Sequence, residues 1–156
     1  DSVTSIGDYA FRYCSSLTSI TIPEGVTSIG YDAFRGCSNI KKVYISSIDS
    51  WLKINFSGYY ANPLCYGADL YINNELVTKV VVPDGITKIK DYAFAGYSKL
   101  KSLTLSDNIL YFGHQGLTDN IDVYYGGNRV QFEHYLGGTR FFDEIELLIY
   151  KSKIFL

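Results

Sequence analysis

A 23-residue internal repeat constrains this chain more than any other feature of its sequence. The run VTSIG at residues 3–7 recurs at residues 26–30, and Ala10-Phe11 recurs as Ala33-Phe34. A third copy begins at Ile86, and a degraded fourth begins 23 residues later at Ile109. A single unit of this length cannot bury its own apolar face, so neighbouring units must stack on one another. The repeat therefore predicts a solenoid.

Each unit combines a short strand with two corners. Residues 17–22 alternate apolar and polar side chains, which indicates a strand with one buried face. Pro23 ends this strand, because proline lacks a ladder donor, and Glu24-Gly25 supplies a turn. We expect residues 31–34 to form a helical turn that places Ala33 and Phe34 in the core.

Six segments read as successive parallel strands on one side of the coil. At about 4.8 Å per strand they would form one sheet about 25 Å wide. Only ten residues separate Leu70 from Val80, too few for a full coil, so Asn73-Asn74 is predicted to turn residues 75–77 back onto residues 70–72. The six segments are residues 20–22, 43–45, 70–72, 80–82, 103–105 and 123–125.

The chain divides into a repeat region and an end piece. We place the solenoid at residues 1–127, with an irregular insert at 47–77, and a C-terminal cap or tail at 128–156. Ser47 or Asp49 is expected to cap a short helix in the insert. Residues 128–137 fit a short amphipathic helix, and residues 145–150 fit either a strand or a helix. Since the sequence contains no Met, we expect it to begin inside a longer chain or after a processed leader.

The repeat resembles the BspA-type leucine-rich repeat, also called the Treponema type. The matching pattern is IPxxVTSIGxxAFxxCxxI over residues 22–40, and the insert and residues 123–127 resemble variants of the same family. This resemblance implies a curved right-handed β/α superhelix with short parallel strands, short helical or 3-10 segments, and a C-terminal cap. It also implies a secreted or cell-surface bacterial protein that binds host proteins, matrix or other cells. Tyr97 replaces the repeat cysteine, and residues 113–117 are a poor copy of the turn.

Composition and motifs exclude several classes of function. A net charge of −2 does not suit a nucleic-acid binder, and no apolar run reaches the roughly 20 residues of a membrane helix. No nucleophile elbow, phosphate loop, zinc-ligand spacing or paired cysteine motif occurs. His114 and His134 lack repeat-locked catalytic partners, and the acidic group Asp143, Glu144 and Glu146 fits a solvated face. We expect no enzymatic activity, no cofactor and no metal.

Two of the three cysteines occupy the same repeat position. Cys14 and Cys37 should therefore lie about 5 Å apart on neighbouring coils, a distance that permits a disulfide. The alternative, which the family's small apolar slot favours, is a pair of free and buried thiols. Cys65 stands by itself in the insert.

The outward-facing strand positions carry the strongest functional signal. Tyrosine presents a flat apolar ring with a polar tip and is enriched at binding surfaces, although it is also a good strand former. The chain holds 15 tyrosines, and Tyr59, Tyr60 and Tyr66 are expected to rim one edge of the sheet. The candidate ligand-binding residues on the sheet face are Tyr44, Tyr71, Val81, Thr104, Tyr124, Lys42, Lys79 and Asp122.

These observations favour a non-enzymatic extracellular binding module of a bacterial surface protein. Its sheet face would recognise a host or matrix protein, or a glycan, on host cells, matrix or other bacteria. The alternative is a structural spacer that extends another domain from the surface. Any signal or anchor would lie outside this segment.

Overall fold

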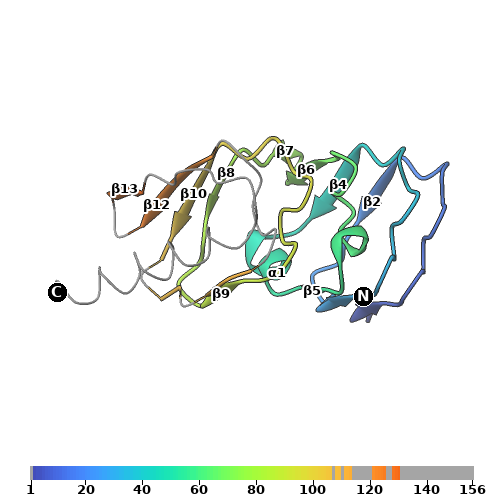
Figure 1. Ribbon diagram of the computed structural model, residues 1–156, viewed down its shortest axis with the longest axis horizontal. Helices are drawn as coiled ribbons and strands as arrows, with labels where there is room; N and C mark the ends of the chain where they lie inside the picture. The colour runs from blue at the N-terminus through green and yellow to red at the C-terminus, as the bar shows by residue number, and fades with distance from the viewer. Residues whose placement is uncertain (1, 107, 110, 114–120, 126–127, 131–156) are drawn as a thin grey trace.

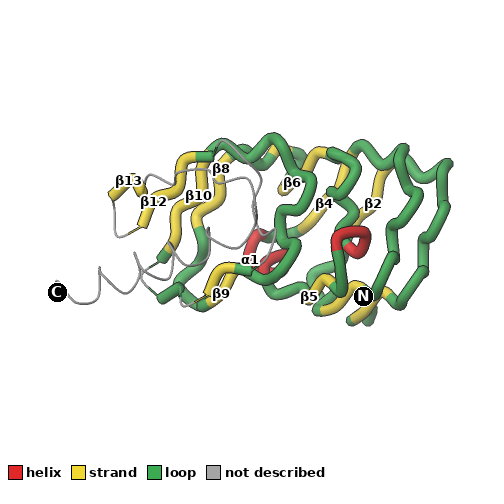
Figure 2. The backbone as a smooth tube through the Cα atoms, viewed as in Figure 1, coloured by secondary structure: helices red, strands yellow, loops and turns green. Residues whose placement is uncertain are grey.

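The chain winds into a solenoid of about five turns, with parallel strands and little helix (Figure 1). The computed structural model describes residues 2–106, 108–109, 111–113, 121–125 and 128–130. Strands line two opposite long sides of the coil, and turns connect them (Figure 2). The elements are β1 (Ser5–Ile6), β2 (Ser19–Thr21), β3 (Ser28–Ile29), β4 (Lys42–Ile45), α1 (Ile48–Leu52), β5 (Asn55–Phe56), the 3-10 helix η1 (Tyr59–Ala61), β6 (Asp69–Ile72), β7 (Glu75–Leu76), β8 (Lys79–Val81), β9 (Lys88–Ile89), β10 (Ser102–Leu105), β11 (Tyr111–Phe112), β12 (Asp122–Tyr125) and β13 (Asn128–Val130).

Strand register follows the repeat. Ile20 of β2 pairs in parallel with Val43 of β4, and Val80 of β8 pairs with Leu103 of β10, each 23 residues apart. Equivalent apolar side chains therefore lie side by side in the core. The repeat turn also recurs, since the amide of Val26 donates to the Pro23 carbonyl and the amide of Ile86 donates to the Pro83 carbonyl. The predicted solenoid is confirmed.

The corner after β3 is built from tight turns instead of the expected helical turn. The backbone amide of Ala33 donates to the Gly30 carbonyl, and the backbone amide of Cys37 donates to the Phe34 carbonyl. In each bond the donor lies three residues after the acceptor. Asp32 between them has a φ of 52°, in the left-handed region that no right-handed helix contains. The expectation of a helix at residues 31–34 was therefore wrong, although Ala33 and Phe34 are fully buried as expected.

All three cysteines are free. Cys37 is buried, and its thiol donates to the Phe11 carbonyl at 2.8 Å. Cys14 is exposed, contrary to the expectation of two buried thiols, because no described coil covers the outer side of the first turn. Burial raises the pKa of Cys65 to about 12. The core thiols are thus held in the unreactive protonated form.

The insert supplies one parallel strand to each side of the solenoid. β5 pairs in parallel with β3, and β6 pairs in parallel with β4. The hydroxyl of Ser47 accepts from the amide of Ser50 at 3.2 Å, so Ser47, and not Asp49, caps α1. Trp51 points into the core and is fully buried.

The predicted hairpin after β6 is confirmed, and it divides the sheet. β7 pairs antiparallel with β6, and Asn73 and Asn74 adopt φ values of 50° and 65°, as a two-residue hairpin turn requires. Because β7 occupies the edge of β6, strand β8 pairs only with β10. The expected continuous six-strand sheet was wrong, and two four-stranded sheets replace it, in the orders β2-β4-β6-β7 and β13-β12-β10-β8.

The same boundary separates the short strands on the opposite side. β1, β3 and β5 form one sheet, and β9 pairs only with β11. We call this boundary, between Leu76 and Lys79 in sequence, the seam. Side chains cross it: the indole N–H of Trp51 donates to the Ala93 carbonyl at 2.9 Å, and the amide of Asn62 donates to the Tyr92 carbonyl at 2.7 Å.

The C-terminal part departs from expectation at residue 128. β13 pairs antiparallel with β12, so the helix expected from residue 128 was wrong over the residues that the structure describes there, 128–130. Phe112 pairs with Ile89, which places Phe112-Gly113 in the slot of the repeat Ile-Gly. His114, His134, the acidic group at 143–146 and the expected strand or helix at 145–150 lie outside the described residues.

Replacing Tyr97 with phenylalanine is expected to change the alkaline pH dependence of stability. The buried Tyr97 hydroxyl donates to the Val77 carbonyl, and burial raises its pKa to about 12. An unfolded chain ionises tyrosine near pH 10, so this group's contribution is present below pH 10 and is lost as the pH rises towards 12. Urea unfolding at pH 7–12 should show that the difference in free energy between wild type and Tyr97→Phe shrinks above pH 10. A difference that is constant over this range would contradict the assignment.

Candidate binding face

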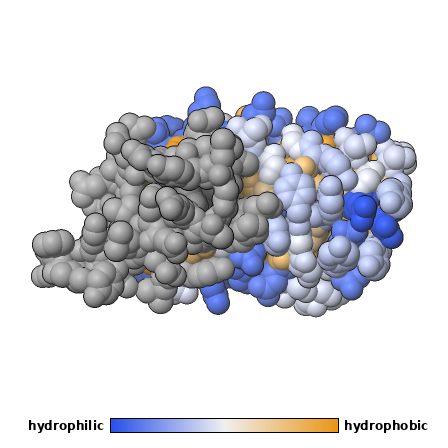
Figure 3. Space-filling view, viewed as in Figure 1, coloured by the Kyte–Doolittle hydropathy of each residue, from blue (hydrophilic) through white to orange (hydrophobic). Residues whose placement is uncertain are grey.

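The outward side chains of the two face sheets form two rows. Their inward neighbours, such as Val43, Leu70 and Leu103, are fully buried, which follows from the alternation of side chains along a strand. The outward residues are exposed or half-buried, and hydrophilic groups follow the upper edge of Figure 3, where Figure 1 places these strands. One row is Thr21, Tyr44, Tyr71, Val81, Thr104 and Tyr124, and the other is Ser19, Lys42, Asp69, Lys79, Ser102 and Asp122.

The first sheet brings three of the candidate residues into contact. The rings of Tyr44 and Tyr71 lie with centroids 5.4 Å apart at 31°, because β4 and β6 pair these two residues directly. The ammonium of Lys42 lies 5.8 Å from the centroid of the Tyr71 ring. This packing restricts the rotation of both rings, so less side-chain entropy would be lost when a ligand binds.

The second sheet places the other five candidates on its own face. Val81, Thr104 and Tyr124 are in direct register, beside Lys79 and Asp122 in the other row. The Val81 side chain is 68% exposed, so this row presents an apolar side chain to solvent between Lys79 and Thr104. The seam separates this group from Lys42, Tyr44 and Tyr71.

A groove runs between the two sheets at the seam. It is bordered by the outer edge of β7 and by β8, and exposed Leu76 pairs with Tyr71 on the outward side. A second hollow lies where β2 and β4 end, beside Tyr44. The first groove is lined by Ile48, Ile72, Asn73, Glu75, Leu76, Val77, Thr78, Lys79, Val80 and Val81, and the second hollow by Thr21, Ile22, Pro23, Glu24, Gly25, Tyr44, Ile45 and Ser46.

Sequence reasoning missed Leu76, Glu24 and Ser46 as members of this face. Leu76 belongs to the face because the hairpin replaces a full coil, and its pairing with Tyr71 could be read from the Asn73-Asn74 turn. The expectation that Tyr59, Tyr60 and Tyr66 border the sheet was wrong. They lie over the turn at residues 35–36, where the hydroxyl of Tyr66 accepts from the amide of Gly36.

The chemistry of this face is that of aromatic rings, hydroxyls and separated charges. The groups whose pKa is shifted to about 12, Cys65 and Tyr97, belong to the core. Within the described residues, no three His, Cys, Asp or Glu side chains are grouped so that they could hold a metal ion. Aromatic rings, hydroxyls and separated charges can together bind a flat or extended ligand.

Comparison with known proteins gives a family match and two structural likenesses. The profile described as the BspA type leucine rich repeat region matches residues 1–62 and 67–121, in six copies. A leucine rich cell surface protein from Faecalibacterium prausnitzii A2-165 is 18% identical, with a TM-score of 0.37, over 80% of this chain and 45% of that one. A Treponema pallidum leucine rich repeat protein is 18% identical, with a TM-score of 0.32, over 79% of this chain and 67% of that one.

This chain spans less than half the length of the Faecalibacterium protein. Among curated proteins, no significant match was found. None of the described helices has the length and apolar character needed to cross a membrane.

Proposed function

The chain belongs to the BspA-type leucine-rich repeat family, and from this premise we propose that it is a non-enzymatic extracellular binding module that recognises its ligand through the sheet face. The ligand is a protein or glycan of host cells, matrix or other bacteria. The Faecalibacterium protein is described as a cell surface protein, which supports an extracellular location for this chain. Solenoids commonly bind through such extended faces.

The contact between Tyr44 and Tyr71 carries the proposal. Two half-buried tyrosines that pack side by side on a flat sheet, with the Lys42 ammonium against one ring, form an aromatic anchor with a charged border. Tyrosine anchors of this kind dominate the energy of many interfaces because a large ring is desolvated at small entropic cost. The exposed Leu76 extends the apolar area beside Tyr71.

Substituting Tyr44, Tyr71 and Tyr124 together by serine tests the proposal. We expect retention of the fluorescently labelled chain on epithelial cells and on laminin–collagen matrix to fall at least about tenfold, since each lost anchor removes more than 1 kcal/mol. Each residue lies on an outward row, so the fold should survive, and circular dichroism will check this.

The control variant carries Asn55→Ser and Lys88→Ser, two exposed positions on the opposite side of the solenoid. It should bind as the unchanged chain does. If the triple variant also binds unchanged, the sheet face is not the recognition surface. If the unchanged chain binds neither surface, the spacer function is favoured, for which the continuous strand pairing within each half would supply stiffness.

A further inference from the structure

The seam brings two strand edges together in the middle of the solenoid. β7 is the last strand of one face sheet and β8 is the last strand of the other, and Figure 1 shows both at the upper side of the coil. Only Val77 and Thr78 connect these strands, which do not pair with each other, and the groove separates them. Described strands lie on both sides of this groove, so its exposure does not arise from an end of the solenoid.

The register of β8 shows which of its backbone groups face the groove. The Val82 amide donates to the Thr104 carbonyl at 2.8 Å, and the Thr78 carbonyl accepts from the residue before β10 at 2.8 Å. The even-numbered positions of this segment therefore bond towards β10. Backbone groups alternate in direction along a strand, so those of Lys79 and Val81 point away from β10 and into the groove.

The facing edge of β7 adds one further residue. Glu75 pairs with Ile72 across the hairpin, and the Val77 amide donates to the Leu70 carbonyl at 2.9 Å, so both positions bond towards β6. The backbone groups of Leu76, which lies between them, therefore point away from β6 and into the groove. Together with the two residues of β8, they offer backbone donors and acceptors that an added extended chain can bond.

The side chains around the groove provide an apolar centre between two charges. Val81 is 68% exposed and Leu76 is 39% exposed. Lys79 and Glu75 are also exposed, and they line opposite ends of the groove, beside the connection between the strands and beside the hairpin turn. Among the residues that the structure describes, neither has a salt-bridge partner. The groove therefore suits a ligand that carries one charge of each sign on either side of an apolar segment.

We propose that the seam groove binds an extended peptide segment of a partner protein, which adds as a strand to the free edge of β8. This assignment rests on the proposed function, because the groove opens onto the sheet face, and it names the element of the partner that is bound. The segment has an acidic residue opposite Lys79, then two apolar residues, then a basic residue near Glu75. Hydrogen bonds with the backbone of Lys79 and Val81 supply affinity, and the side chains supply selectivity.

NMR titration of the isotope-labelled full chain with two blocked hexapeptides tests the assignment. Ser-Glu-Val-Ile-Lys-Ser fits parallel addition, and Ser-Lys-Ile-Val-Glu-Ser fits antiparallel addition. Each is compared with a copy that is N-methylated at its four central amides and so cannot donate from them. We expect at least one probe to bind with a Kd below about 1 mM, and its N-methylated copy to bind at least about tenfold more weakly.

Amide hydrogen exchange locates the bound peptide. In the free chain, the Val81 amide should exchange faster than the Val82 amide, which is bonded to Thr104. A saturating probe should slow exchange at Val81 at least about tenfold and leave Val82 nearly unchanged. Protection of Val81 that rises with protein concentration in the absence of peptide would overturn the proposal in favour of a second copy of this chain.

Charge reversal tests the orientation of the peptide without disturbing the core. A copy of each probe with its Glu and Lys exchanged should bind the unchanged chain about two- to fivefold more weakly than the original. Lys79→Glu combined with Glu75→Lys, at two exposed positions, should reverse this preference. A preference that stays the same in this variant would contradict the placement of the peptide.

Val81→Pro tests the backbone contribution. It removes the N–H that faces the groove and leaves the Val82 bond to β10, and proline is tolerated at such an edge. Probe binding should fall at least about fivefold, whereas Val81→Thr, which keeps the N–H, should retain most of it. Circular dichroism checks the fold of both variants. Absence of saturable binding up to about 5 mM, or equal binding of the N-methylated copy, would overturn the proposal.

A last variant separates this proposal from the proposed function. Tyr44→Ser with Tyr124→Ser should leave probe binding unchanged, because neither residue lines the seam groove. Failure of the probes to bind, together with loss of cell retention in the triple tyrosine variant, would overturn the seam site alone. Probe binding together with unchanged retention of that variant would overturn the tyrosine anchor alone.

Discussion

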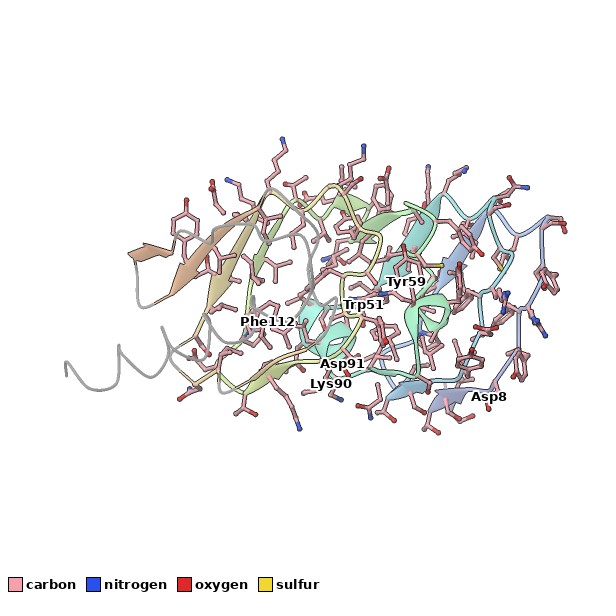
Figure 4. All side chains as sticks on the ribbon, in the orientation of Figure 1. Asp8, Trp51, Tyr59, Lys90, Asp91 and Phe112 are labelled. Carbon is pink, nitrogen blue, oxygen red and sulfur yellow. The ribbon has the colours of Figure 1, made fainter. Side chains whose placement is uncertain are left out.

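Replacing Trp51 with alanine is expected to lower the free energy of unfolding by about 4 kcal/mol, because it empties a large, fully enclosed site. The Trp51 side chain has no exposed surface, and its ring packs at 5.2 Å from that of Phe56. Its N–H also crosses the seam to the Ala93 carbonyl. Figure 4 shows Trp51 on α1 near the turn that bears Lys90 and Asp91.

Trp51→Phe is the matched control. It keeps most of the apolar volume and removes the N–H, while the Asn62 amide, 3.2 Å from the Ala93 carbonyl, still satisfies that acceptor. Trp51→Phe should therefore lower the free energy of unfolding by less than Trp51→Ala does, by about 1–2 kcal/mol. Urea unfolding must be followed by circular dichroism, because Trp51 is the sole tryptophan of the sequence. A loss of less than about 1 kcal/mol in Trp51→Ala would show that the site collapses around the cavity.

Gly96→Ala is expected to lower the free energy of unfolding by about 3 kcal/mol, because the added methyl group would collide with backbone atoms of a neighbouring coil. A Cβ at Gly96 would lie 2.7 Å from the Leu64 carbonyl oxygen and 2.8 Å from the Cys65 Cα, across the seam. The residue also has a φ of 78°, which adds the penalty of a left-handed alanine.

Gly67→Ala separates these two contributions. Gly67 has nearly the same φ, 79°, but nothing lies within 4 Å of an added Cβ. Gly67→Ala should therefore lower the free energy of unfolding only by the cost of an alanine in the left-handed region, about 1 kcal/mol. Thermal and urea unfolding of both variants will check the difference, and equal losses would mean that the Leu64–Cys65 backbone moves aside freely.

The periodic part of the fold could be predicted because the repeat fixes both spacing and side-chain direction. Ile20 and Val43 pair in register as their 23-residue separation requires, and the hairpin followed from too few residues between Leu70 and Val80. The division of the sheet was missed because it depends on which edge β7 takes. Two strands cannot share the edge of β6, and no local propensity expresses that competition.

The turn geometry lay beyond sequence reasoning for a different reason. The apolar pattern at Ala33 and Phe34 indicates burial but does not specify the backbone conformation, and the positive φ of Asp32 excludes a right-handed helical turn here. The outward rows of the candidate face could be derived from strand alternation alone.

The seam has a consequence for how the molecule comes apart. Neither strand side carries backbone pairing across it, so among the described residues the two halves are held by side chains such as Trp51, Asn62 and Tyr97 and by the connecting chain. The coupling between the halves therefore depends on the apolar core that they share and on these side-chain hydrogen bonds. A pulling force along the solenoid axis is therefore expected to open this junction first, because no strand-pairing hydrogen bonds of the described residues have to break there.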